Sequence, residues 1–425
     1  MNPPGGEAEA ARWLVDLLDR RGVETALIKT PSPPEGPRRA AAIARVRGTG
    51  ELPPLLLLSH LDVVAARSTG WHEDPFAGVI RRGHVVGRGA LDAKGLAIVH
   101  ALALEGLARR PEKLRRDVVL LSVPDEEAGG NDGLGWILQE RSELLEGVEY
   151  VLGEGGSIRD NPSQRPLWSV SVAEKSACWL ELRTRGTPGH SASPARDAAV
   201  PRLIAALERI RTMDSEIRVV PEVARMFRAM EPIAQSRDRA AYRDLAGALD
   251  RDADFRRRFL RHRANQALVS STAAITVLQG ATATNVAPAQ ARGQIDARLL
   301  PGERCDEFEQ RVRKRVDDAA VDQVRLLAVN SGSSPVDTPL YRAIEATARE
   351  LDPGSLVVPA MGAGSSDAHW LRERGLVVYG FVPRWLRDEE AHGVHGPNER
   401  ISIRNLQRGT AALIRLIENF DELDR

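Results

Sequence analysis

Histidine and acidic side chains follow three apolar stretches of this sequence. They are His60 and Asp62 after residues 55–58, Glu126 and Glu127 after residues 118–123, and Glu154 after residues 150–152. The carboxyl ends of parallel strands meet at one edge of an α/β sheet, so side chains distant in sequence can converge there. Imidazole nitrogens and carboxylate oxygens bind metal ions. The pattern therefore indicates a metal site built on the ends of strands.

Two of these positions have a second interpretation that the residues alone leave open. A carboxylate two residues after a metal-bound histidine can fix the tautomer of its ring, which makes Asp62 a candidate partner of His60. The pair can equally be a strand-end histidine followed by a capping aspartate. Asp92 precedes a predicted helix at residues 94–109, where an aspartate can cap the helix. Its two oxygens could also bridge two metal ions.

The adjacent glutamates Glu126 and Glu127 indicate chemistry most directly. Neighbouring carboxylates after an apolar strand repel each other and lose solvation unless a cation or a proton lies between them. Metal binding would explain Glu127, and proton transfer to and from the reacting groups would explain Glu126. A solvated acidic turn is the alternative. His392 and His395 lie in a glycine-rich loop, and either could supply a distal ligand.

The hydrophobic pattern predicts the elements that position these residues. In the first part of the chain, strands and helices alternate as in a βαβ sheet. After residue 176 the pattern changes to an inserted α+β segment, and the earlier pattern resumes near residue 332. The predicted elements are strands at 25–28, 55–58, 118–123, 150–152, 177–183, 271–278, 293–299, 356–358 and 376–382, and helices at 11–18, 94–109, 198–211, 338–351 and 403–420.

A chain of 425 residues exceeds what one hydrophobic core usually serves, which favours two domains. The sequence predicts an α/β catalytic domain at residues 1–176 and 332–425, and an inserted domain at residues 177–331. A charged stretch at residues 215–265 is interpreted as solvated helices packed on the insert, with a substrate-gating or partner surface as the alternative.

Composition limits the partners and the compartment. The 59 basic residues balance the 59 acidic ones, so no net charge favours nucleic acid or an anionic membrane. Without a signal-like start or a long apolar run, we expect a cytoplasmic protein with no membrane partner. Cys178 and Cys305 match no paired-cysteine motif, and we expect them to be ordinary thiols. We assign the remaining histidines to surface or packing positions: His72, His84, His100, His262 and His369.

Taken together and in order, the segments 59–64, 71–76, 87–95, 125–127, 153–156 and 395–399 resemble a metallopeptidase family. That family includes carboxypeptidase S, aminoacylase, acetylornithine deacetylase and succinyl-diaminopimelate desuccinylase, and the resemblance covers nearly the whole chain. The charged stretch and residues 265–272 after it resemble the carboxypeptidase S and N-acyl-amino-acid hydrolase branch.

This resemblance implies a site with two Zn²⁺ ions per subunit, for which Co²⁺ or Mn²⁺ could substitute. It implies that His60 and Glu154 bind one ion, that Glu127 and His395 bind the other, and that Asp92 bridges both. Three protein ligands per ion would leave an open position for water, as in catalytic zinc sites. Glu126 would be the general base.

The resemblance also implies a three-layer zinc-peptidase-like domain interrupted by an α+β lid and dimerisation domain. In that lid, His190 in the segment 186–191 is expected to stabilise the oxyanion from across a homodimer. Asn285 and Arg298 are expected to bind the substrate carboxylate, for which a guanidinium is suited. Gly364, in the glycine-rich segment 361–367, is expected to line the substrate site.

The expected reaction is hydrolysis of an amide bond beside a free carboxylate, in a small peptide or an N-acyl amino acid. The sequence does not decide between peptidase and deacylase, because the two differ only in the acyl side. Two other functions stay open. A non-catalytic metal-binding dimeric scaffold would not need Glu126, and a two-metal phosphoesterase would need further basic groups besides Arg298.

Overall fold

The computed structural model describes residues 6–160, 165–387 and 393–423, and the chain forms two compact units. Unit 1 comprises residues 1–172, 334–360 and 366–425, and unit 2 comprises residues 173–333 and 361–365. The sequence places the division after residues 176 and 331. In the structure, the division falls after residues 172 and 333, and the segment 361–365 joins unit 2.

Unit 1 is built on an eight-stranded sheet with the order β1-β2-β6-β3-β7-β16-β8-β15. The strands are β1 (Glu24–Lys29), β2 (Ala40–Val46), β3 (Leu52–His60), β6 (Arg116–Val123), β7 (Tyr150–Arg159), β8 (Leu167–Glu174), β15 (Leu356–Gly362) and β16 (Val377–Leu386). Strands β6, β3, β7 and β16 pair in parallel. Their carboxyl ends therefore meet at the same edge of the sheet, where an α/β fold places its binding site.

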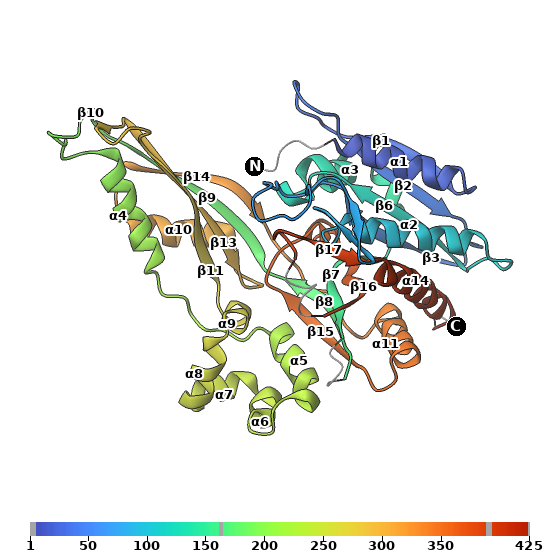
Figure 1. Cartoon of the computed structure of the whole chain (residues 1–425). Coiled ribbons are helices and arrows are strands. Elements are labelled where there is room, and N and C mark those ends of the chain that lie inside the picture. Colours follow the sequence, from blue (N-terminus) through green and yellow to red (C-terminus); the bar gives the residue numbers. More distant parts are fainter. Residues whose placement is uncertain (1–5, 161–164, 388–392, 424–425) are drawn as a thin grey trace. The chain divides into compact units, whose positions relative to one another are not determined.

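Alternating apolar side chains give this sheet two buried faces. Leu55 and Leu57 of β3 pack in one hydrophobic cluster, and Leu56 and Leu58 pack in another on the opposite face. The first face is covered by α1 (Glu7–Asp19), α2 (Lys94–Ala108), α11 (Pro339–Leu351) and α14 (Ile403–Leu423) (Figure 1). The second is covered by α3 (Trp136–Glu140) and α12 (Ala368–Arg372). The expected three-layer α/β domain is confirmed.

Smaller elements complete unit 1. A three-stranded sheet contains β4 (Val79–Arg81), β5 (His84–Val86) and β17 (Arg400–Ser402), and short helical turns cover Glu126–Ala128 (η1), Asn131–Gly135 (η2) and Ser142–Leu145 (η3). Among the described residues of both units, no helix combines the length and the apolarity that crossing a bilayer requires.

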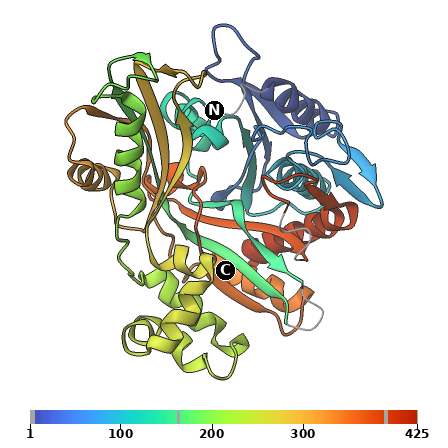
Figure 2. The ribbon, with the colours of Figure 1, turned by 60° about the vertical axis from the view of Figure 1, so that its left-hand side comes forward.

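Unit 2 contains a four-stranded antiparallel sheet with the order β11-β13-β9-β14. These strands are β9 (Ser176–Arg185), β11 (Thr272–Gln279), β13 (Gln290–Leu299) and β14 (Val321–Val329), and a short ribbon pairs β10 (Gly189–His190) with β12 (Val286–Ala287). The helices α4 (Ala199–Arg211) and α10 (Cys305–Val316) pack on one face. Figure 2 shows α4 running along the long strands. Strand β11 is a largely exposed edge.

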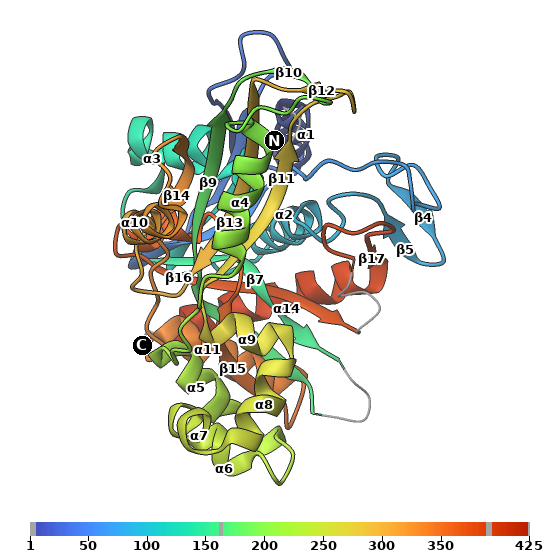
Figure 3. The same cartoon turned by 90° about the vertical axis from the view of Figure 1, so that its left-hand side faces the viewer.

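The charged stretch forms a helical cluster in unit 2, as the first interpretation of its sequence predicts. It contains α5 (Pro221–Met230), η4 (Glu231–Ile233), α6 (Arg239–Arg243), α7 (Leu245–Arg251), α8 (Ala253–Arg261) and α9 (Arg263–Val269) (Figure 3). Phe227, Phe255 and Phe259 lie at its centre with Leu245 and Leu249, and most of its arginines are exposed.

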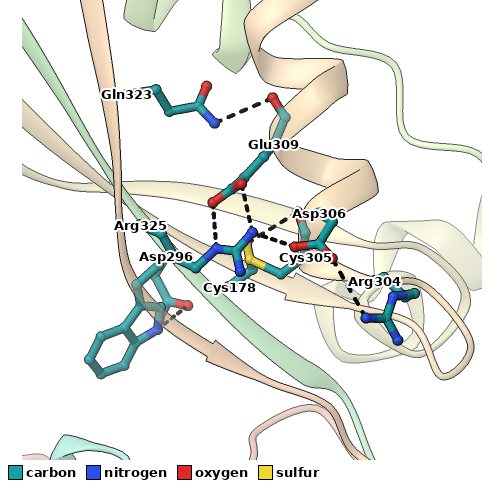
Figure 4. Close-up of a disulfide and its surroundings, with 9 residues drawn as sticks. Cys178, Asp296, Arg304, Cys305, Asp306, Glu309, Gln323 and Arg325 are labelled. Carbon is teal, nitrogen blue, oxygen red and sulfur yellow. Dashed lines mark hydrogen bonds and ion pairs between the residues drawn. A yellow bond between two sulfur atoms is a disulfide. The ribbon is translucent and has the colours of Figure 1, made fainter.

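The cysteine prediction is wrong, because Cys178 and Cys305 form a disulfide. Their Cα atoms lie 5.4 Å apart, within the range that a disulfide spans. Cys178 lies on β9 and Cys305 begins α10, and both side chains belong to the core between the sheet and its helices. Their separation of 127 positions in the sequence conceals this proximity. Figure 4 shows the bond beside Arg325 of β14, which pairs with Asp306 and Glu309 of α10.

We expect the Cys178→Ser/Cys305→Ser double variant to lose stability in unit 2 and to keep that of unit 1. The bond closes a long loop, and chain-entropy arguments give an upper value of about 5 kcal/mol for such a loop. Hydrogen exchange resolved by peptide should show faster exchange in β9, β13 and α10. Equal exchange with and without the bond would contradict a stabilising role.

Candidate metal centre

Five side chains of unit 1 converge at the carboxyl edge of its sheet. His60 is the last residue of β3, Glu127 follows β6 within η1, and Glu154 lies in β7. Asp92 precedes α2, and His395 lies in the loop before β17. The structure thus brings together the five ligands that the sequence resemblance implies.

Asp92 lies between two histidine–glutamate pairs. Nε2 of His60 is 3.0 Å from Oδ1 of Asp92 and 3.0 Å from Oε2 of Glu154. Nε2 of His395 is 3.1 Å from Oδ2 of Asp92 and 3.1 Å from Oε1 of Glu127. Each oxygen of Asp92 therefore faces a different pair, which is the arrangement that a bridging carboxylate requires.

The charges of these groups also fit bound cations. Hydrogen bonds to Asp92 and Glu127 raise the pKa of His395 to about 10, against a smaller opposing effect of burial. Burial lowers the pKa of His60, but the charge of Glu154 and hydrogen bonds to Asp62, Asp92 and Glu154 outweigh it and raise that pKa well above its usual range. Without metal ions, the positive charge of the protonated imidazoles balances the negative charge of the carboxylates. The nitrogen and oxygen donors of this group are ligands that suit zinc.

Asp62 supports the site through contacts beyond the one with His60 that its spacing suggests. Its carboxylate accepts hydrogen bonds from the backbone N–H groups of Glu126 (3.1 Å) and Glu127 (3.0 Å). Nδ1 of His60 lies 3.0 Å from the main-chain oxygen of Asp62 and 3.5 Å from its carboxylate. The nearer contact of the ring is therefore the carbonyl, while the Asp62 carboxylate fixes the two glutamates.

Glu126 is nearly buried beside the first histidine. Its Oε2 lies 3.9 Å from Nε2 of His60, and its side chain is 9% exposed. Burial raises its pKa well above the usual range, and the charge of Glu154 adds to that effect. Glu126 is close enough to His60 and Glu154 to form a three-ligand group with them. Distance alone therefore does not separate a base from a ligand at this position.

Asp367 is a residue of the site whose role the sequence did not predict. It is 4% exposed, and it lines a small cavity together with His60, Glu126 and Glu154. Within the described part of the chain, neither of its carboxylate oxygens has a hydrogen-bond partner. Burial, and next the charge of Asp62, raise its pKa well above the usual range. The only signal in the sequence was its place as the last residue of the glycine-rich segment 361–367, directly before α12.

Glycine allows two strands to approach closely at Glu154. Gly380 of β16 pairs with Gly153 of β7, the residue before Glu154. A Cβ atom at Gly380 would lie 2.2 Å from the Glu154 carbonyl oxygen, a distance that real Cβ atoms do not adopt. A side chain at position 380 would therefore displace the backbone that carries this ligand.

The three expected residues of the inserted domain lie in unit 2, and so does Gly364, which the sequence places in the catalytic domain. His190 is exposed on β10, and its Nδ1 accepts a hydrogen bond from the N–H of Ala192 (3.0 Å). In the ribbon of β10 and β12, His190 pairs with Val286, the residue after Asn285. The carbonyl of Asn285 accepts a hydrogen bond from the backbone N–H of Ser191 (3.2 Å).

Arg298 and Gly364 have well-defined partners within unit 2. Nε and Nη2 of Arg298 bond both oxygens of Asp296, at 2.8 and 3.1 Å. Asp296 also accepts a bond from the indole of Trp179 (3.0 Å), which holds the pair on β13. The carbonyl of Gly364 accepts a bond from the backbone N–H of Lys175 (3.2 Å).

The histidines assigned to packing behave as expected where they are buried. His100 is fully buried in α2, and burial lowers its pKa to about 3. His369 packs on the ring of Trp370 at 4.7 Å, and burial lowers its pKa to about 4. His392, the alternative to His395, lies outside the described residues.

Comparisons with known proteins show the family of the chain. Residues 56–419 match the model of peptidase family M20/M25/M40. The mouse N-fatty-acyl-amino acid synthase/hydrolase PM20D1 is 31% identical over 389 residues, which cover 87% of this chain and 75% of the mouse protein. The probable carboxypeptidase S-like 2 of Dictyostelium discoideum is 25% identical over 87% of this chain and 72% of its own length.

A solved structure shares the fold. The M20 family metallo-carboxypeptidase Sso-CP2 from Sulfolobus solfataricus superimposes with a TM-score of 0.77, at 18% identity, over 99% of this chain and 97% of its own. The family model covers most of the chain, including the residues that carry all five converging side chains. The chain therefore belongs to peptidase family M20/M25/M40, and it is a metallopeptidase or amidohydrolase.

Proposed function

We propose that this protein is a two-zinc hydrolase that cleaves an amide bond beside a free carboxylate. The observation that carries the proposal is Asp92, whose two oxygens each face one histidine–glutamate pair. His60 and Glu154 would hold one ion, Glu127 and His395 the other, and Asp92 both. Co²⁺ or Mn²⁺ could replace zinc. When bound, the two ions would supply Lewis acidity that polarises a carbonyl and lowers the pKa of water.

Glu126 is the proposed general base. It would accept a proton from the attacking water and return it to the nitrogen of the leaving amine as the C–N bond breaks. The raised pKa supports this role, since a base that works near neutral pH must also be able to hold the proton. Asp62 would keep Glu126 in place through its bond to the backbone of that residue.

Residues of unit 2 would complete substrate recognition. His190 would donate a hydrogen bond to the developing oxyanion, and Asn285 and Arg298 would bind the substrate carboxylate. Gly364 would line the site without a side chain. Arg298 already binds Asp296, so a substrate carboxylate would have to share or replace that partner.

The relatives suggest two substrate classes for one reaction. PM20D1 is named for N-fatty-acyl amino acids, and the Sulfolobus protein is a carboxypeptidase. Both names describe an amide next to an amino-acid carboxylate, so we propose a small peptide or an N-acyl amino acid as the substrate. The buried Glu126 favours this hydrolase over a non-catalytic scaffold, which would not need a base.

We also propose a homodimer formed through unit 2. Strand β11 is an exposed sheet edge, and Leu278 on it and Ile204 on α4 are 60% and 53% exposed. Unpaired edges with apolar neighbours are suited to pairing with a second copy.

The cytoplasm stays the proposed compartment. Counting the free thiols of this protein in cell extracts would test the compartment, because disulfides such as Cys178–Cys305 are rare in the cytoplasm.

A substrate panel with the zinc-loaded protein tests the reaction. We expect turnover of dipeptides or of N-acetyl and long-chain N-acyl amino acids, and no turnover of the same compounds with the carboxylate converted to an amide. Arg298→Ala should raise KM for the carboxylate substrates. Hydrolysis of bis(p-nitrophenyl) phosphate in place of all the amides would favour a phosphoesterase.

The adjacent glutamates should separate by role when each is changed to glutamine. Glu126→Gln should keep both ions and lose about 10² to 10⁴-fold in kcat, because only the proton transfer is removed. Glu127→Gln should bind fewer ions, because it removes a ligand. Metal analysis beside kinetics distinguishes the two. Near-normal turnover of Glu126→Gln would exclude it as the base.

Subunit exchange tests whether His190 acts across a dimer. We expect His190→Ala to lose activity while it keeps its metal content, because the oxyanion loses a donor. Mixing it with Glu126→Gln subunits should restore part of the activity, since one composite site would then be intact. Light scattering should show dimers. Dimers without recovery after verified exchange would place His190 in the site of its own chain.

A further inference from the structure

Arg384 of β16 contacts the backbone that carries the bridging aspartate. Its Nη1 donates a hydrogen bond to the carbonyl of Leu91, the residue before Asp92, at 2.7 Å. Its Nε is buried and has no hydrogen-bond partner among the described residues. Among the residues that the structure describes, no carboxylate lies within 4 Å of the Arg384 guanidinium. No salt bridge with these residues therefore cancels its charge.

Glu399 holds the backbone N–H groups of the same segment. Oε1 of Glu399 accepts hydrogen bonds from the N–H groups of Leu91 (2.7 Å) and Asp92 (3.0 Å). Oε2 of Glu399 binds Arg88, and Glu399 is fully buried. The carbonyl and the N–H groups of this segment are therefore each fixed by a charged side chain. Charged hydrogen bonds are stronger than neutral ones, so the position of Asp92 is closely defined.

The charge of Arg384 acts on the metal centre as well. Burial lowers the pKa of Arg384, and the charges of Asp92, Glu154 and Glu399 oppose that shift, so these carboxylates lie close enough to interact with the guanidinium. Glu126, Glu127, Asp62 and Asp367 add further acidic groups around the same site. Gathering so many carboxylates costs free energy through repulsion and lost solvation. The positive charge of Arg384 near Asp92 and Glu154 lowers that cost.

We propose that Arg384 is a positioning residue that aims Asp92 at both metal ions and stabilises the carboxylates before the ions bind. This inference rests on the proposed two-metal function, and it assigns to Arg384 no contact with substrate. Groups that orient metal ligands typically contribute about 10 to 100-fold in metal affinity. The effect should extend to both ions, because Asp92 is shared by the two pairs.

The test measures metal affinity without any substrate. Wild type, Arg384→Met and Arg384→Lys are titrated with Zn²⁺ in a competing chelator, and bound zinc is counted by mass spectrometry. We expect Arg384→Met to bind zinc about 10 to 100-fold more weakly. Arg384→Lys should recover part of the loss, because it restores the charge but not the geometry of the guanidinium.

Arg372→Gln is the matched control. Arg372 also donates to main-chain carbonyls beside β16, at 3.0 Å to Val378 and 3.4 Å to Ser171. We expect this variant to lower the melting temperature and to keep wild-type zinc affinity. A loss of affinity as large as that of Arg384→Met would show a general effect of unfolding and would overturn the proposal.

Two further outcomes are decisive. Unchanged zinc affinity in Arg384→Met, with a higher KM only for carboxylate substrates, would make Arg384 a substrate-binding residue and would overturn the proposal. A wild type that binds two zinc ions but hydrolyses no amide would contradict the proposed function alone. The weaker binding of Arg384→Met would then still support the role of Arg384.

Discussion

Repulsion between carboxylates is the constraint on which the rest of unit 1 depends. The parallel strands β3 and β6 end at one edge, and the pairing of β3 with β7 stops two residues before Glu154, which brings His60, Glu127 and Glu154 together there. Such a cluster is stable only with cations or protons among its members. The raised pKa values of both site histidines express this need. The sheet therefore prepares a centre whose charge balance favours the binding of metal ions.

The supports of the site are mostly backbone contacts of charged side chains. The Asp62 carboxylate binds the N–H groups of the two adjacent glutamates, and Glu399 binds those of Leu91 and Asp92. Each carboxylate thus holds two successive peptide groups in place. This form of support holds the main chain that carries the ligands.

Unit 2 is organised by different interactions. Its sheet packs against α4 and α10, and the Cys178–Cys305 bond joins β9 to the start of α10 inside that core. The charged helices around Phe227, Phe255 and Phe259 form their own apolar cluster within the unit. The groups expected to meet substrate lie instead on an exposed ribbon, which carries His190, and on β13, which carries Arg298.

The sequence by itself determined the fold class and most central strands and helices, because apolar periodicity is a local signal. Strand-end motifs indicated His60, Glu127 and Glu154, whereas Asp92 and His395 entered the ligand set through the family resemblance. It did not predict β2, β8, β14 and α10. The β2 segment is rich in alanine, whereas the apolar spacing of Phe308, Val312 and Val316 in α10 is a helical signal that was missed. Only the tertiary structure decided the partner of Cys178, the cavity around Asp367, and the contacts of Arg384 and Glu399 with the segment before α2. These depend on which distant segments pack together, and residue type and spacing along the chain carry no record of that.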